Sequence, residues 1–157
     1  MAPMLRNRDV LTNPALNKST AFTAAEREQL GLRGLLPARE GTQTLQIERV
    51  LENLRRKDTD IERYVFLMAL QARNERLFHR TLLDHIDEIM PLVYTPTVGQ
   101  ACREFAHIFR QPRGFYISSE DRGRVREMLD NWSERDIRMI VITDGARTLG
   151  LGYPGAT

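Results

Sequence analysis

The feature that most restricts the fold of this chain is a series of apolar residues at helical spacing between residues 44 and 109. In residues 44–56, the apolar positions 47, 50, 51 and 54 recur at i, i+3, i+4 and i+7, which predicts an amphipathic helix. The segment that begins at Asp60 and breaks near Asn74 is apolar on more than one face, which predicts the central buried helix. Further helical patterns run up to Pro91 and from residue 98 to residue 109.

The pattern changes after residue 114. Residues 115–117 form a short segment of aromatic and β-branched residues. Residues 125–132 have apolar residues at helical spacing, which predicts one more helix. Residues 137–143 contain the apolar run Met-Ile-Val-Ile. Asp144-Gly145 is a tight-turn signal, after which residues 148–151 read as a returning strand. This order predicts an α+β fold, in which a mostly helical N-terminal part precedes a small β-α-β-β sheet.

The domain organisation is simple. Residues 1–20 lack periodicity and contain Asn13-Pro14, which predicts an extended N-terminal arm. Residues 21–157 are expected to form one domain, because a chain of 157 residues is long enough to bury a core of its own. Two small subdomains that share this core would also fit the length. The fractions of hydrophobic and charged residues, 41% and 28%, are those of a globular protein.

Composition excludes several classes of function. No apolar run approaches about 18 residues, so we expect no transmembrane helix and no membrane partner. The first nine residues have no apolar signal-peptide core and include an acid, Asp9, which predicts a cytoplasmic location. The single cysteine, Cys102, permits no internal disulfide. Because the net charge is only +2 and the 23 basic residues are interspersed with 21 acids, no nucleic-acid partner is expected.

Residues 90–99, Met-Pro-Leu-Val-Tyr-Thr-Pro-Thr-Val-Gly, end one helical pattern and start another. Either Thr95 caps the new helix with Pro96 at its first position, or Thr97 caps it in a capping box. In both cases, unpaired backbone N–H groups and the positive end of a helix dipole would lie near Tyr94, where an anion would find donors. The alternative is that Tyr94 is only an amphipathic core residue.

Three other sequence features could carry chemistry. Residues 150–155 match G-x-G-x-x-G, but a dinucleotide-binding loop needs a following helix in a βαβ unit, and only two residues follow. The three histidines lack the spacing that puts two imidazoles on one helical face, so no metal site is predicted. Arg147 lies in a turn between predicted strands, where its planar guanidinium suits a carboxylate. The alternative is a surface ion pair with Asp144.

Residues 90–99 and residues 141–152, Val-Ile-Thr-Asp-Gly-Ala-Arg-Thr-Leu-Gly-Leu-Gly, resemble the two signature blocks of the N-terminal domain of the malic enzyme family. Further blocks are similar to the family in the same order: Leu16-Asn17-Lys18, Ala21-Phe22-Thr23, Gly34-Leu35-Leu36-Pro37, Leu70-Gln71, Arg73-Asn74-Glu75, Pro112-Arg113-Gly114 and Asp130-Asn131-Trp132. The resemblance covers residues 11–152. It implies an enzyme that oxidises L-malate with NAD or NADP and decarboxylates the product to pyruvate and carbon dioxide, using Mg²⁺ or Mn²⁺.

The resemblance also implies roles for particular residues. Tyr94 matches the general acid that protonates enolpyruvate, and Arg147 matches the arginine that holds the substrate carboxylate. Arg49 and Arg73 match allosteric arginines that bind fumarate at the dimer interface of activator-responsive members. Gly41 stands where those members carry an acidic residue.

The sequence also departs from the family. Ala146 replaces a glutamate, and residues 153–155 replace an aspartate-containing continuation. The chain ends before the family's catalytic lysine, metal-binding acids and dinucleotide-binding domain. We therefore expect this chain alone to bind no cofactor and no metal and to turn over no malate.

Two interpretations of the function follow from the resemblance. The first is the N-terminal domain, or a truncated form, of an NAD(P)-dependent malic enzyme. The second is a non-catalytic dimerisation module that docks onto a full-length malic enzyme. The expected partner is thus a second copy of the chain or a malic enzyme subunit.

Overall fold

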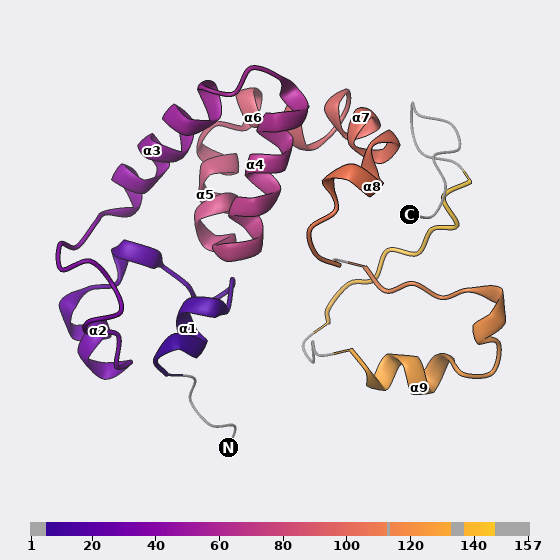
Figure 1. Cartoon of the computed structure of the whole chain (residues 1–157), viewed down its shortest axis with the longest axis horizontal. Coiled ribbons are helices and arrows are strands. Elements are labelled where there is room, and N and C mark those ends of the chain that lie inside the picture. Colours follow the sequence, from indigo (N-terminus) through magenta and orange to yellow (C-terminus); the bar gives the residue numbers. More distant parts are fainter. Residues whose placement is uncertain (1–5, 113, 133–136, 147–157) are drawn as a thin grey trace. The chain divides into compact units, whose positions relative to one another are not determined.

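The computed structural model of the chain describes residues 6–112, 114–132 and 137–146 (Figure 1). The chain divides into two compact units, Met1–Arg103 and Glu104–Thr157. The first unit contains α1 (Arg8–Thr12), the 3-10 helix η1 (Ser19–Ala21), α2 (Ala24–Gln29), α3 (Gln43–Arg55), α4 (Asp60–Arg73), α5 (Glu75–Asp84), α6 (Ile86–Val93) and α7 (Thr97–Arg103). The second contains α8 (Phe105–Ile108), the 3-10 helix η2 (Ser119–Asp121) and α9 (Val125–Asp130).

Short polar side chains set the starts of α3, α4 and α5. Thr42 accepts a hydrogen bond from the Leu45 N–H before α3, and Thr59 forms a capping box with Glu62 before α4. Asn74 ends α4 and caps α5. Each of these side chains satisfies an N–H group that the helix cannot pair internally. The helices predicted over residues 44–56 and from Asp60 to Asn74 are confirmed to within a residue.

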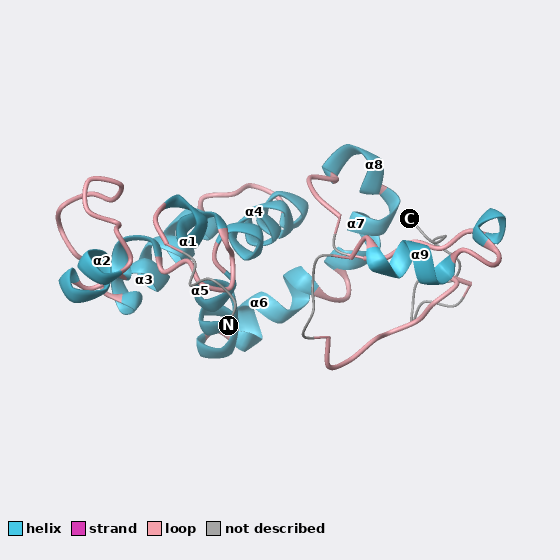
Figure 2. Ribbon diagram, turned by 90° about the horizontal axis from the view of Figure 1, so that it is seen from below, coloured by secondary structure: helices cyan, strands magenta, loops and turns pink. Residues whose placement is uncertain are grey.

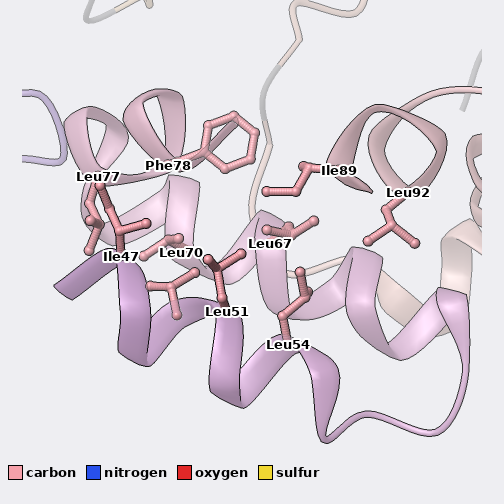
Figure 3. Close-up of a cluster of buried hydrophobic side chains, with 10 residues drawn as sticks. Ile47, Leu51, Leu54, Leu67, Leu70, Leu77, Phe78, Ile89 and Leu92 are labelled. Carbon is pink, nitrogen blue, oxygen red and sulfur yellow. The ribbon is translucent and has the colours of Figure 1, made fainter. Parts of the chain in front are cut away.

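The main core lies around α4, which contacts α3, α5, α6 and α7. Leu67 and Leu70 of α4 are fully buried, which confirms α4 as the central helix. Figure 3 shows the cluster of apolar side chains that α4 shares with its neighbours. Its buried members are Ile47, Val50, Leu51, Leu54, Leu67, Leu70, Leu77, Phe78, Ile89 and Leu92.

The N-terminal arm is not simply extended, because its described part contains α1 and packs on the rest of the first unit. Val10 of α1 is buried with Phe22 and Leu32 in a second, smaller cluster. Farther along the arm, the Pro14 carbonyl accepts a hydrogen bond from the backbone N–H of Glu75 at 3.0 Å. The arm is therefore tied to the junction between α4 and α5.

The predicted β-α-β-β sheet is wrong for the part of the chain that the structure describes. Residues 115–117 and 137–143 form no strand there, and Figure 2 shows only helices and loops outside the grey segments. The third predicted strand, residues 148–151, lies outside the described residues.

The physical reason is that a β-strand is stable only when it is hydrogen-bonded to a second strand. An apolar run in the sequence does not show whether such a second strand is present. The side chains of residues 139–142 are 71–89% exposed. Of the described residues in the second unit, only Gly145 is buried, so that part of the unit has no core on which a sheet could form.

Candidate functional site

Tyr94 lies at the junction of α6 and α7. Its backbone N–H donates to the Met90 carbonyl at 2.9 Å, which closes α6, and its carbonyl accepts from the Val98 N–H at 2.9 Å, at the start of α7. The peptide bond that precedes Pro96 is cis. The side chain of Tyr94 is 53% exposed, so the phenol is open to solvent and is not a core residue.

The anion site predicted at this helix start is not supported. α7 begins at Thr97, which is buried, so Pro96 lies before the helix and not at its first position. The N–H of Val98 already donates to Tyr94, and the N–H of Gly99 donates to the Pro96 carbonyl at 3.1 Å. Two of the donors expected to face an anion are therefore used within the turn itself.

Arg49 and Arg73 line one cavity of about 280 Å³ in the first unit. Arg49 comes from α3 and Arg73 is the last residue of α4. Tyr94 does not line this cavity. The remaining lining residues are apolar or uncharged: Asn17, Ser19, Thr20, Gln46, Val50, Asn53, Phe66, Asn74 and Leu77. The structure thus brings together the two arginines that the resemblance pairs, without an acidic residue in the lining.

The charge on these two arginines is unbalanced in the part of the chain that the structure describes, since neither guanidinium has an ion pair there. Some other arginines of the chain do have an ion-pair partner. Arg55 of α3 donates to both carboxylate oxygens of Glu88, at 3.0 and 2.8 Å, and that hydrogen bond lowers the pKa of the Glu88 carboxyl below its usual value. An anion entering the Arg49–Arg73 cavity would therefore meet two cations that no carboxylate neutralises.

A hydrogen-bond network holds the part of the N-terminal arm that lines the cavity. The buried side chain of Gln46 donates to the Lys18 carbonyl at 3.0 Å and to Thr20 Oγ1 at 3.2 Å. The side chain of Asn17 donates to the Arg73 carbonyl at 2.9 Å. Asn17, Ser19 and Thr20 of the arm thus line the cavity, and the arm is held there by α3 and by the end of α4.

Gly41 packs against the same part of the arm. Its N–H donates to the Thr20 carbonyl at 2.9 Å, and a Cβ placed on Gly41 would meet Thr20 Oγ1 at 2.8 Å. Any side chain at this position, including the acid of activator-responsive relatives, would require Thr20 to move. The glycine is therefore matched to the present position of the arm.

Arg27 is a structural residue that the sequence did not reveal. It is 6% exposed, and its guanidinium donates to four backbone carbonyls: Phe22 at 2.8 Å, Pro37 at 2.7 Å, Ala38 at 3.3 Å and Thr20 at 3.0 Å. It thereby joins the loop after α2 to the arm segment that lines the cavity. No sequence signal separates Arg27 from the many exposed arginines of the chain.

The remaining predicted sites are not tested by the structure. Arg147 and the glycine motif at residues 150–155 lie outside the described residues. Among the residues that are described, no three His, Cys, Asp or Glu side chains gather where they could hold a metal ion. None of the described helices is both long and apolar enough to cross a membrane.

Comparison with known proteins identifies the family. The family described as malic enzyme, N-terminal domain, matches residues 71–157, more than half of the chain. The chain belongs to the malic enzyme family. This confirms the resemblance seen in residues 90–99 and 141–152.

Individual relatives are similar over almost the whole chain. The chloroplastic NADP-dependent malic enzyme of Oryza sativa subsp. japonica is 50% identical over 146 residues, which are 93% of this chain and 23% of that protein. The mitochondrial NAD-dependent malic enzyme of Ascaris suum is 48% identical over 158 residues, 99% of this chain and 25% of that protein. An NADP-dependent malic enzyme of Homo sapiens is 50% identical over 143 residues, which are 91% of this chain and 25% of that protein. The chain thus spans about a quarter of the length of these relatives.

Proposed function

We propose that this chain supplies the N-terminal part of a malic enzyme active site, in which Tyr94 is the general acid and Arg147 binds the substrate carboxylate. The observation that carries the proposal is the family match, because residues 71–157 include both residues. The open position of the Tyr94 phenol also supports it, since a general acid must reach the carbon that it protonates. In this scheme Tyr94 delivers a proton to the enol form of pyruvate and recovers one from solvent.

Two proteins test the proposal. The 157-residue chain alone is expected to form no NADH or NADPH from malate in the presence of Mn²⁺. A chimera in which residues 11–152 replace the matching part of the human NADP-dependent malic enzyme is expected to be active. A chimera that folds and binds NADP but does not oxidise malate would overturn the proposal.

We also propose that the Arg49–Arg73 cavity binds a small dicarboxylate such as fumarate. Arg49→Gln and Arg73→Gln are each expected to weaken fumarate binding about 10-fold to 100-fold, because each removes a charge-assisted hydrogen bond worth about 1.5–3 kcal/mol. Isothermal titration calorimetry measures the affinity, and Arg56→Gln is the control, because Arg56 is exposed and outside the cavity. Equal losses in all three variants would mean that only the net charge matters.

A second candidate function is a non-catalytic module that docks onto a malic enzyme subunit. The observation that favours it is a stripe of exposed apolar side chains from the end of α5 onto α6: Leu83 of α5 is 67% exposed, and Ile86 and Met90, one turn apart on α6, are 45% and 40% exposed. Ile86→Glu is expected to abolish capture of the purified human enzyme by the immobilised chain. Leu35→Glu, another exposed apolar position, should leave capture intact. Capture that survives Ile86→Glu would exclude this stripe.

We further propose a cytoplasmic location. The relatives include proteins named as chloroplastic and mitochondrial, so the family does not fix the compartment. The free thiol of Cys102 is compatible with a reducing compartment. A fluorescent fusion of the chain that collected in an organelle would contradict this location.

A further inference from the structure

We propose that a second cavity of the first unit, at the start of α3, binds a phosphate group, either free phosphate or the phosphate of a small monoester. This α3 cavity has a volume of about 230 Å³. It shares two lining residues, Gln46 and Asn74, with the Arg49–Arg73 cavity, but neither of those arginines lines it. Its lining residues, none of which is acidic, are Lys18, Ala21, Gly41, Thr42, Gln43, Gln46, Asn74 and Arg76.

The side chain of Asn74 offers a buried donor that the described part of the protein leaves unused. Asn74 is 3% exposed, and its Oδ1 accepts a hydrogen bond from the Leu77 N–H at 2.9 Å. None of the described residues accepts a hydrogen bond from its amide nitrogen, whereas the amide nitrogen of Gln46 donates to two oxygens. A buried amide donor is normally paired. A ligand in the cavity that Asn74 lines would supply the acceptor.

This donor is not sealed inside the protein. Among the described residues, no side-chain nitrogen or oxygen atom is both closed to solvent and without a hydrogen-bond partner. The amide nitrogen of Asn74 therefore keeps an open side, and for a residue that is 3% exposed the opening lies toward the cavities that it lines. The donor is thus within reach of a bound anion.

The start of α3 adds backbone donors to the same cavity. Thr42 is the N-cap and Gln43 is the first residue of this helix of 13 residues, and both line the cavity. Thr42 Oγ1 accepts from the Leu45 N–H at 3.1 Å. The N–H groups of Gln43 and Thr44 have no acceptor among the described residues. Free N–H groups and the positive end of a helix dipole together favour an anion.

Two cationic side chains also line the cavity. Lys18 is ion-paired with Glu26, so its charge is balanced within the protein. Arg76 of α5 is exposed and has no ion pair in the part of the chain that the structure describes. The cavity therefore holds one positive charge that no carboxylate neutralises, in addition to the partial positive charge of the helix start.

The distribution of the donors favours phosphate over carboxylate. They come from separate segments: the arm, the start of α3, the junction between α4 and α5, and α5 itself. A carboxylate has two oxygens in one plane, which suits a single planar guanidinium. A phosphate monoester carries three strong acceptor oxygens that point in different directions and about −1.5 to −2 charges at neutral pH. Phosphate can therefore accept from several of these segments at once.

Titration of the full chain with inorganic phosphate, followed by ¹H–¹⁵N correlation NMR, tests the site. The side-chain amide of Asn74 and the backbone amides of Gln43 and Thr44 are expected to shift together with a single Kd. A parallel titration with glycerol 3-phosphate identifies the source of the phosphate group, since the tighter of the two probes is the form that the cavity prefers. The proposal is wrong if these three signals stay in place at about 10 mM of either probe, where a site with a millimolar Kd would be mostly filled.

Two arginine variants separate the α3 cavity from the proposed dicarboxylate site. Arg76→Gln is expected to weaken phosphate binding about tenfold and to leave fumarate binding unchanged. Arg49→Gln should do the opposite, and the exposed Arg56→Gln, which lies outside both cavities, should change neither. Equal losses of phosphate binding in Arg76→Gln and Arg56→Gln would overturn the site. Because each site is read with its own anion, the dicarboxylate site can fail while the phosphate site stands.

Asn74→Asp tests the buried donor itself. Aspartate still accepts from the Leu77 N–H and is a good N-cap, so α5 should be kept, as far-UV circular dichroism can verify. The variant replaces the amide donor with a carboxylate that repels an anion, and it is expected to abolish the phosphate-dependent shifts of Gln43 and Thr44. Phosphate binding that persists in both Asn74→Asp and Arg76→Gln would show that the anion binds elsewhere.

Discussion

Arg27→Met is expected to lower the free energy of unfolding by about 3 kcal/mol or more, the largest effect on stability that we expect from one polar side chain of this protein. Four backbone carbonyls, those of Thr20, Phe22, Pro37 and Ala38, accept hydrogen bonds from the buried guanidinium. A methionine fills similar space but donates nothing, and each buried acceptor left unpaired costs about 1–3 kcal/mol. Urea denaturation followed by far-UV circular dichroism measures the loss.

Two further variants separate the role of these hydrogen bonds from that of charge. Arg33→Met removes an exposed arginine that is ion-paired with Glu28, so its effect should stay below about 1 kcal/mol. Arg27→Lys keeps the charge, but one ammonium group cannot reach all four carbonyls that surround the planar guanidinium. Arg27→Lys should therefore destabilise the fold nearly as much as Arg27→Met. If Arg27→Met and Arg33→Met lost the same stability, the carbonyl network would not stabilise the fold.

The hydrogen bonds of Arg27 should also influence the shape of the Arg49–Arg73 cavity. The Thr20 carbonyl that Arg27 holds also accepts from Gly41, and the Thr20 hydroxyl accepts from Gln46. Asn17, Ser19 and Thr20 line the cavity together with Arg49 and Arg73. The position of the arm, and with it the shape of the proposed dicarboxylate site, therefore depends on a guanidinium that never enters the cavity.

Helices were predictable from the sequence because their signals are local. Apolar spacing gave α3 and α4 to within a residue, and the break at Asn74 appears as a residue that ends one helix and caps the next. Both the spacing and the caps lie within a few residues of the hydrogen bonds that they create. The burial of Leu67 and Leu70 followed from the same pattern.

Strands, the cavity and the carbonyl network were not predictable, because each depends on residues far apart in the chain. The run at residues 139–142 has the composition of a strand but no pairing partner among the described residues. The cavity joins the arm to α3 and to the end of α4, across more than 50 positions between Asn17 and Arg73. Of the candidate site residues, Arg49 and Arg73 were identified only through resemblance to the family, since neither spacing nor composition separates them from ordinary arginines. Tyr94 was singled out by its place beside a predicted helix start, but its role as a general acid came only from the resemblance.

Tyr94→Phe in the chimera with the human enzyme is expected to lower kcat for malate by about 10²-fold to 10⁴-fold, the usual contribution of a general acid. The loss should appear in kcat with little change in KM, because the phenol proton is needed after malate has bound. Stability should not change, since the side chain is 53% exposed and its hydroxyl has no hydrogen-bond partner in the described residues. Initial rates of NADPH formation measure the effect.

Tyr116→Phe is the matched control, because Tyr116 is also 53% exposed and lies outside both signature blocks. It should leave kcat unchanged, which would show that removal of an exposed phenol is not harmful in itself. A step-specific readout distinguishes acid catalysis from a merely structural role: the chimera supplied with oxaloacetate should still decarboxylate it, whereas protonation of the resulting enol would be slow in Tyr94→Phe. An unchanged kcat in Tyr94→Phe would remove this residue from the chemistry, and the proton would then have to come from another part of the enzyme or from water.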